Sequence, residues 1–213
     1  MLAMFSIKKH PVQVLLFAYI LGIFYWAWMH ATGNIGTVAP FLPNILFLNH
    51  ADLWSLVFPG ILPLLSGLFG IMLSKKWGFL SASLGRAIFF ISVGLFMWGL
   101  GSVTFSYYNI VLDIAVPYPS LADVGFVLGP PFWIIGLFNL GKGIGAGYKM
   151  RAPRGKVIIA LIVVFGLSVS YYLLVSVARS GVFDFTESGI LKVTLDVLYP
   201  LFDTFLLTLI ILI

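Results

Sequence analysis

The chain alternates between long apolar segments and short segments that carry most of its charges. A helix needs about 20 mostly apolar residues to cross the roughly 30 Å hydrocarbon core of a bilayer. Six segments meet this requirement with few or no charged residues. The pattern therefore predicts an all-α fold, a polytopic bundle of six transmembrane helices, with spans at about 12–31, 53–74, 79–106, 121–141, 157–178 and 190–213.

The composition excludes a water-soluble globular fold. Of the 213 residues, 61% are hydrophobic and 9% are charged, whereas soluble domains usually have about 25% charged residues. The chain has no cysteine, so it holds neither a disulfide framework nor a thiolate metal site. We expect a single transmembrane domain that covers residues 1–213.

The basic residues predict the orientation of the bundle. Ten of the 12 Lys and Arg residues fall on one side of a six-span arrangement, and cytoplasmic loops are the ones enriched in such residues. Both termini are therefore predicted to be cytoplasmic. The net charge of +5 is better explained by anionic lipid headgroups at that face than by nucleic acid. The ten residues are Lys8, Lys9, Lys75, Lys76, Arg86, Lys142, Lys149, Arg151, Arg154 and Lys156, and Arg179 and Lys192 lie opposite.

The segment Pro117-Tyr-Pro-Ser-Leu-Ala-Asp123 precedes the fourth predicted span. Ser120 followed three residues later by Asp123 is typical of a capping box, with the acid near the positive end of the helix dipole. A second segment, Leu198-Tyr-Pro-Leu-Phe-Asp-Thr-Phe-Leu-Leu207, lies in the last span.

Together these two segments resemble motifs of the polytopic N-terminal sensor modules of bacterial diguanylate cyclases, phosphodiesterases and related histidine kinases. The resemblance covers about residues 80–213, and it implies a sensory role in the cytoplasmic membrane of a prokaryote. The chain departs from those modules at Gly101-Ser102, where a glycine-acid pair is expected. No output domain follows Ile213 in the sequence, so cyclase activity is not implied, and a fragment of a longer protein is one interpretation of the chain.

Polar residues form a stripe on each of the last two spans. Four residues of the sixth span and four of the fifth recur at helical spacing. Because sequential spans run antiparallel, we expect the stripes to face each other, either as a ligand-binding seam or as hydrogen bonds that only fix helix register. The stripes are Lys192, Asp196, Tyr199 and Asp203, and Ser168, Tyr172, Ser176 and Arg179.

Asp203 is expected to face inward and to pair with Arg86 at a comparable depth, directly or through water, because a lone charge in the membrane is costly. The predicted ligand-binding residues are Arg86, Tyr172, Ser176, Asp196, Tyr199 and Asp203.

The sequence gives little support for a metal site, a cofactor or catalysis. His30 and His50 flank the long loop after the first span, near Asp52, but interfacial histidines are ordinary, so we predict no metal site and no cofactor. The tryptophans are interpreted as interfacial belts. No nucleophile-base pair or carboxylate dyad with a partner is visible, so an enzyme is not expected.

We therefore predict an integral membrane sensory or ligand-binding module. It would bind a small molecule and assemble as an oligomer or within a larger membrane complex. The alternatives are a small transporter or channel-like subunit, in which Arg86, Asp196 and Asp203 line a pathway, and an accessory structural subunit.

Overall fold

The computed structural model describes residues 11–37, 48–145, 153–172 and 187–213, and this part of the chain is all-α. Two short segments, a π-helical turn η1 and a 3₁₀ turn η2, connect or extend the helices. The elements are α1 (Pro11–Thr32), α2 (His50–Leu56), η1 (Val57–Ile61), α3 (Leu62–Ser74), η2 (Lys75–Trp77), α4 (Ser83–Ile110), α5 (Leu121–Gly143), α6 (Pro153–Tyr171) and α7 (Glu187–Leu212).

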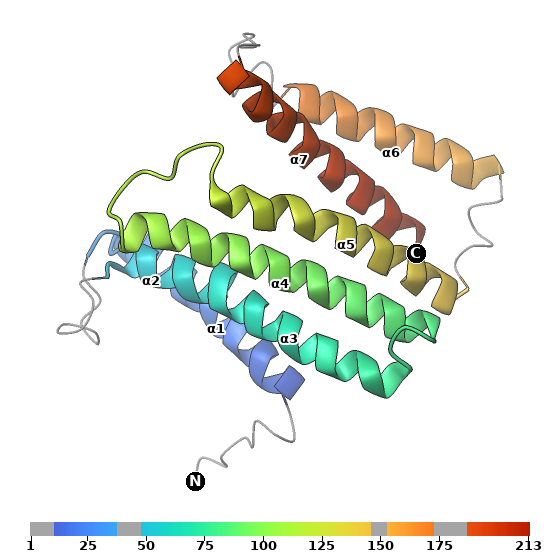
Figure 1. Ribbon diagram of the computed structural model, residues 1–213, viewed down its shortest axis with the longest axis horizontal. Helices are drawn as coiled ribbons and strands as arrows, with labels where there is room; N and C mark the ends of the chain where they lie inside the picture. Colours follow the sequence, from blue (N-terminus) through green and yellow to red (C-terminus); the bar gives the residue numbers. More distant parts are fainter. Residues whose placement is uncertain (1–10, 38–47, 146–152, 173–186) are drawn as a thin grey trace.

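The elements form six rods, because α2, η1 and α3 follow one another without a break. Helix α4 lies at the centre and packs against α5 on one side and against α3 on the other (Figure 1). Helix α7 packs against α5 and α6, while α1 contacts α2 and α3. The order across the bundle places α7 beside the start of α5, which is where the two sequence motifs lie.

Five of the rods are long and apolar enough to cross a membrane. Five of the six predicted spans are thus confirmed as helices with the length and apolar composition of membrane spans. The remaining one, predicted at 157–178, corresponds to α6, whose apolar part Ala160–Val169 is shorter than a spanning helix among the described residues. Residues 173–178 lie outside the described part of the chain.

The second rod accommodates Pro59 through a local change of helical pitch. Proline lacks the N–H that an α-helical hydrogen bond requires, and its ring crowds the preceding turn. Residues Val57–Ile61 form a π-helical turn around it, and the Leu62 N–H bonds to the Val57 carbonyl. The rod therefore continues past the proline instead of ending there.

Helix α4 begins at Ser83, not at residue 79 as predicted. The reason is a tight reversal in which Gly78 has φ +86° and Phe79 has φ +48°, left-handed values that cannot continue a helix. The backbone of Trp77 and Phe79 lies so close to Gly85 that a Cβ atom there would overlap it. A glycine at this position lets the reversal fold back onto the first turn of α4.

Helices α4 and α5 approach closely because glycines line their interface. A Cβ atom on Gly125 would lie 2.5 Å from the Gly101 nitrogen and 2.6 Å from the Met97 oxygen. Gly94 lies directly under the Trp133 ring, and the Trp133 indole N–H donates to the Ile91 carbonyl at 3.2 Å. Small residues of this kind allow the close helix packing that stabilises membrane bundles.

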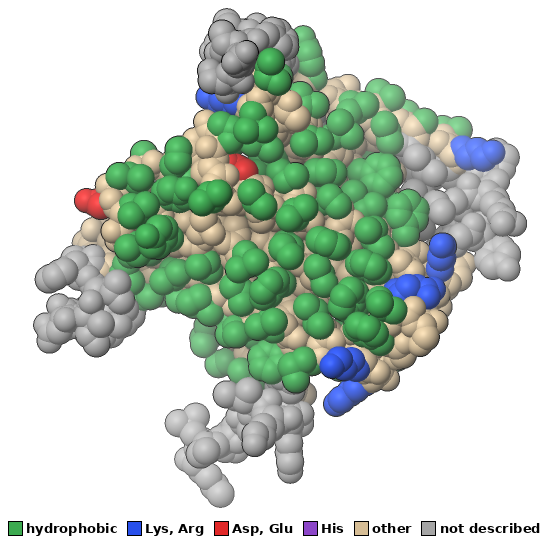
Figure 2. All heavy atoms as spheres, in the orientation of Figure 1, with side chains coloured by type: hydrophobic (Ala, Val, Ile, Leu, Met, Phe, Trp, Pro, Cys, Tyr) green, Lys and Arg blue, Asp and Glu red, His purple; other side chains and the backbone are tan. Residues whose placement is uncertain are grey.

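Charges separate along the bundle. Most lysine and arginine side chains visible in Figure 2 gather at one end of an otherwise apolar face. This end carries η2 with Lys75 and Lys76, the last turn of α5 with Lys142, and the first turn of α6 with Lys156. The segregation agrees with the distribution that the sequence predicts for one side of the membrane.

Candidate functional site

The first sequence motif forms the start of α5 as predicted. Ser120 is the N-cap residue, and its Oγ accepts from the Ala122 N–H at 3.2 Å. The Asp123 Oδ2 accepts in return from the Ser120 N–H at 2.7 Å and from the Ser120 hydroxyl at 3.2 Å. The capping box is therefore confirmed, and it fixes the orientation of the Asp123 carboxylate.

The second motif reaches this same carboxylate. The Tyr199 hydroxyl of α7 donates to the Asp123 Oδ1 at 2.6 Å, so both oxygens of Asp123 are occupied. A second link joins the loop to α7, since the Tyr118 hydroxyl donates to the Asp196 Oδ1 at 2.5 Å. Two segments more than 70 residues apart in sequence are thus joined by crossed tyrosine–carboxylate hydrogen bonds.

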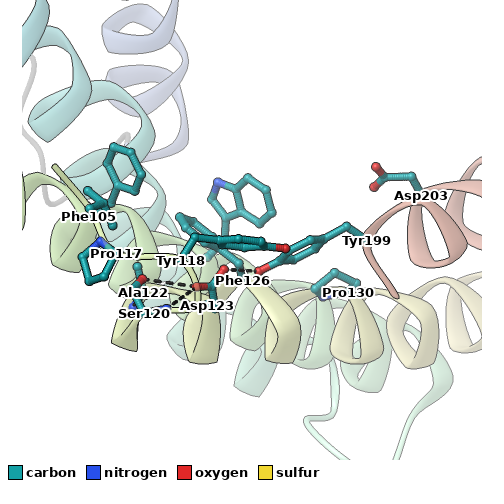
Figure 3. Close-up of a pocket in the computed structure, with 12 residues that line it drawn as sticks. Phe105, Pro117, Tyr118, Ser120, Ala122, Asp123, Phe126, Pro130, Tyr199 and Asp203 are labelled. Carbon is teal, nitrogen blue, oxygen red and sulfur yellow. Dashed lines mark hydrogen bonds between the residues drawn. The ribbon is translucent and has the colours of Figure 1, made fainter. Parts of the chain in front are cut away.

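A pocket of about 470 Å³ opens beside these two links (Figure 3). Its walls come from α4, from the loop before α5, from the first half of α5 and from α7. This volume falls in the range of small-molecule sites, roughly 300–1,000 Å³. The lining residues are Trp98, Phe105, Val116, Pro117, Tyr118, Ser120, Ala122, Asp123, Phe126, Pro130, Tyr199 and Asp203.

Aromatic rings make up much of the pocket wall. The Trp98 ring packs against Phe126 at 4.9 Å and against Trp133 at 5.6 Å between centroids. Both tryptophans therefore belong to the α4–α5 interface. The glycines opposite them leave the space that these large rings occupy.

Asp203 lies one helical turn beyond Tyr199 on α7 and lines the same pocket (Figure 3). Its side chain borders the pocket and is also exposed at the surface of the bundle, so the prediction that it faces inward stays a prediction. No hydrogen bond or ion pair links its carboxylate to another side chain or to the backbone in the described part of the chain. Asp203 therefore has a carboxylate at the edge of the pocket, whereas both oxygens of the Asp123 carboxylate already accept hydrogen bonds.

The predicted pair between Arg86 and Asp203 is wrong. The Arg86 Nε donates to the Asn139 Oδ1 at 2.9 Å, and the other guanidinium nitrogens donate to the Leu80 carbonyl and the Ser83 hydroxyl. The reversal before α4 supplies the Leu80 carbonyl and α5 supplies Asn139, so the guanidinium is hydrogen-bonded at the basic end of the bundle. Arg86 does not line the pocket.

The two polar stripes do not face each other among the described residues. Tyr172 is 61% exposed, and the Ser168 hydroxyl donates to the Val164 carbonyl of its own helix. Helix α6 instead meets α7 where Gly166 lies against the Thr204 side chain. The α7 stripe turns toward the loop before α5, which the sequence-based pairing did not consider. Ser176 and Arg179 lie outside the described residues.

The histidines considered as metal ligands have separate partners. The His50 Nδ1 shares a 2.5 Å hydrogen bond with the Tyr25 hydroxyl, and the His30 Nδ1 lies 2.9 Å from the Trp26 carbonyl oxygen. No group of three His, Cys, Asp or Glu side chains is placed to hold a metal ion within the described segments.

Several pocket residues were not predicted as site residues. Tyr118, Trp98 and Phe105 were missed, and Asp123 was assigned a capping role alone. The available signal was a Tyr and an Asp close together in each segment, Tyr118 and Asp123 in the first motif, and Tyr199 of the second motif with Asp196 three residues before it. Two such pairs can exchange hydrogen bonds crosswise, as they do here.

Comparisons with protein-family models, with curated proteins and with solved structures found no match to this chain. The resemblance to bacterial sensor modules therefore remains a prediction that rests on its two motifs, and the site is characterised by its geometry alone.

Proposed function

We propose that this chain is a membrane-embedded ligand-binding module of the sensory type, and that the pocket between α4, α5 and α7 is its ligand site. The observation that carries this proposal is the convergence of the two motifs. Residues of both motifs bond to each other and line one pocket of suitable size. Packing of α4, α5 and α7 alone would not require a pocket between the two motifs.

The same contacts suggest how binding would be transmitted. Tyr118 and Tyr199 are at once pocket walls and the hydrogen-bond donors that hold α7 to the loop and to α5. A ligand that displaces either ring would loosen one link and favour another position of α7. Pro200 follows Tyr199 directly and lacks the N–H for a helical hydrogen bond, so α7 bends more easily at this point.

A transport pathway has less support than a binding pocket. A pathway would require polar side chains that continue along α7 from Asp203 toward the basic end of the bundle. Beyond Asp203, α7 continues as Thr-Phe-Leu-Leu-Thr-Leu-Ile-Ile-Leu, and its two threonines bond to carbonyls of their own helix. The pocket lining extends no farther along α7 than Asp203.

A tethered occupant tests the proposal without knowledge of the natural ligand. The variant Val116→Cys places the chain's one thiol in the pocket wall, where benzyl methanethiosulfonate attaches a benzyl group. We expect the adduct to change the hydrogen exchange of backbone amides in residues 117–126 and 190–203. The control is Val111→Cys with the same adduct, because Val111 is 61% exposed and lies outside the pocket. Equal exchange with both adducts would show that filling the pocket does not reach α7.

A further inference from the structure

The chemistry of the pocket wall restricts what it can bind. Trp98, Phe105, Phe126, Tyr118 and Tyr199 supply aromatic surface, and Val116, Pro117 and Pro130 add aliphatic surface. Aromatic rings carry a negative potential on their faces and attract cations, most strongly for tryptophan and for desolvated groups. An existing contact of this type lies at the rim, where the Lys192 Nζ is 5.6 Å from the centroid of the Tyr118 ring.

Within the described segments, the charged side chains beside the pocket are mostly negative. Three carboxylates lie in it or next to it, those of Asp123, Asp196 and Asp203. Lys192 lies at the rim, over the Tyr118 ring, and Arg86 is bound to Asn139 at the other end of the bundle. An anionic ligand would therefore meet repulsion, whereas a cation would find compensation for the cost of leaving water.

The three carboxylates also differ in the hydrogen bonds that they accept from the described residues. Asp123 accepts on both oxygens from Tyr199 and Ser120, and Asp196 accepts from Tyr118. Asp203 has no such link within the described chain and lines the pocket from the same face of α7 as Tyr199. A ligand cation near Asp203 would pair with this carboxylate while its apolar part contacts Trp98 and Phe126.

We infer that the pocket takes an organic cation, an ammonium group with an apolar substituent, with the ammonium beside Asp203 and the substituent against the aromatic wall. This inference rests on the proposed function and adds the chemical class of the ligand. An ammonium of this kind can belong to a free amine or to the headgroup of a lipid, because both present the same group to a carboxylate and an aromatic surface.

Two probes of matched shape and opposite charge test the inference on the full chain in dodecyl maltoside. We expect benzyltrimethylammonium to bind at least about tenfold more tightly than phenylmethanesulfonate in equilibrium dialysis. Asp203→Asn should weaken benzyltrimethylammonium by about tenfold or more, since it keeps the shape and removes the charge. Asp52→Asn, which removes a carboxylate from α2 and outside the pocket, should change the affinity by less than twofold.

Two additions separate the sources of the ammonium group. Displacement of benzyltrimethylammonium by added phosphatidylcholine, and not by diacylglycerol, would identify a lipid headgroup as the ligand. Binding that neither lipid changes would identify a free organic cation. Both results support the inference.

The contrary outcomes are distinct. Equal or tighter binding of phenylmethanesulfonate, an unchanged affinity in Asp203→Asn, or no binding of either probe overturns the cation inference. The proposed function would survive any of these if the benzyl adduct at residue 116 still alters exchange in α7. It fails separately if that adduct has no effect.

Discussion

Asp123 has two structural roles that would ordinarily need two side chains. One oxygen closes the capping box with Ser120, and the other accepts the Tyr199 hydroxyl of α7. The cap fixes the carboxylate in the orientation that Tyr199 needs, so the start of α5 and the middle of α7 depend on the same group. Loss of either hydrogen bond should therefore weaken the other.

We expect Tyr199→Phe to destabilise the chain by about 0.6–1.7 kcal/mol, from the average to the largest value for interhelical hydrogen bonds inside a membrane protein. The ring remains and the hydroxyl is lost, so packing is little changed. Unfolding in SDS–detergent mixtures measures the effect, with Tyr171→Phe as the control because Tyr171 is 66% exposed.

A double-mutant cycle with Asp123→Ala, which removes the acceptor, assigns the loss to this hydrogen bond. The coupling free energy should account for most of the Tyr199→Phe effect. A coupling near zero would mean that the Tyr199 hydroxyl contributes nothing through Asp123.

At the scale of elements, the sequence predicts the helices well and their neighbours poorly. Apolar runs locate the spans because the hydrocarbon core imposes a length that the sequence displays directly. The observed helix boundaries differ from the predicted ones where a residue has a non-helical backbone conformation. Gly78 is an example, because its φ of +86° ends η2 and α4 starts only after the reversal. Such a reversal depends on the contact with Gly85, which periodicity does not reveal.

The pairing of stripes failed for a related reason. Lys192, Asp196, Tyr199 and Asp203 do share one side of a helix, but the sequence does not state which neighbour that side meets. The prediction chose α6 because it is adjacent in sequence, whereas α7 contacts both α6 and α5. Only the three-dimensional order of the helices, with α5 beside α7, places Tyr118 opposite Asp196.

The glycine interface between α4 and α5 leads to a prediction about packing. Gly125→Ala should destabilise the chain by about 1–3 kcal/mol, because the new Cβ would overlap the backbone of Gly101 and Met97. Gly129→Ala is the matched control on the same helix, since its Cβ would lie 3.2 Å from the Gly94 oxygen. There the gain in helix propensity, up to about 1 kcal/mol, offsets the mild crowding.

Thermal unfolding of the two variants in detergent provides the comparison. Equal stability of Gly125→Ala and the unmodified chain would show that α4 and α5 separate without cost at this point.

At the scale of the whole molecule, the pocket and most of the described basic residues lie toward opposite ends of the bundle. The pocket begins at the loop that ends in Ser120, whereas Lys75, Lys76, Lys142 and Lys156 lie near the other end. We propose that the basic end is cytoplasmic and contacts anionic lipid headgroups. The pocket would then open toward the outer half of the membrane, and α7 would carry a change there toward the cytoplasmic face.

This orientation can be tested because the chain has no cysteine, so each introduced thiol is the one site of labelling. Gly36→Cys and Ala115→Cys place thiols in the loops at the pocket end, at exposed positions, and a Cβ atom at residue 36 meets nothing within 4 Å. Ala82→Cys places one in the exposed reversal before α4, at the basic end.

In intact cells, a membrane-impermeant maleimide should label residues 36 and 115, and it should label residue 82 only after the membrane is opened. This result follows from the bias of Lys and Arg toward cytoplasmic loops, because Lys75, Lys76, Lys142 and Lys156 would otherwise face the outside. Labelling of residue 82 alone in intact cells would invert the bundle and direct the pocket toward the cytoplasm.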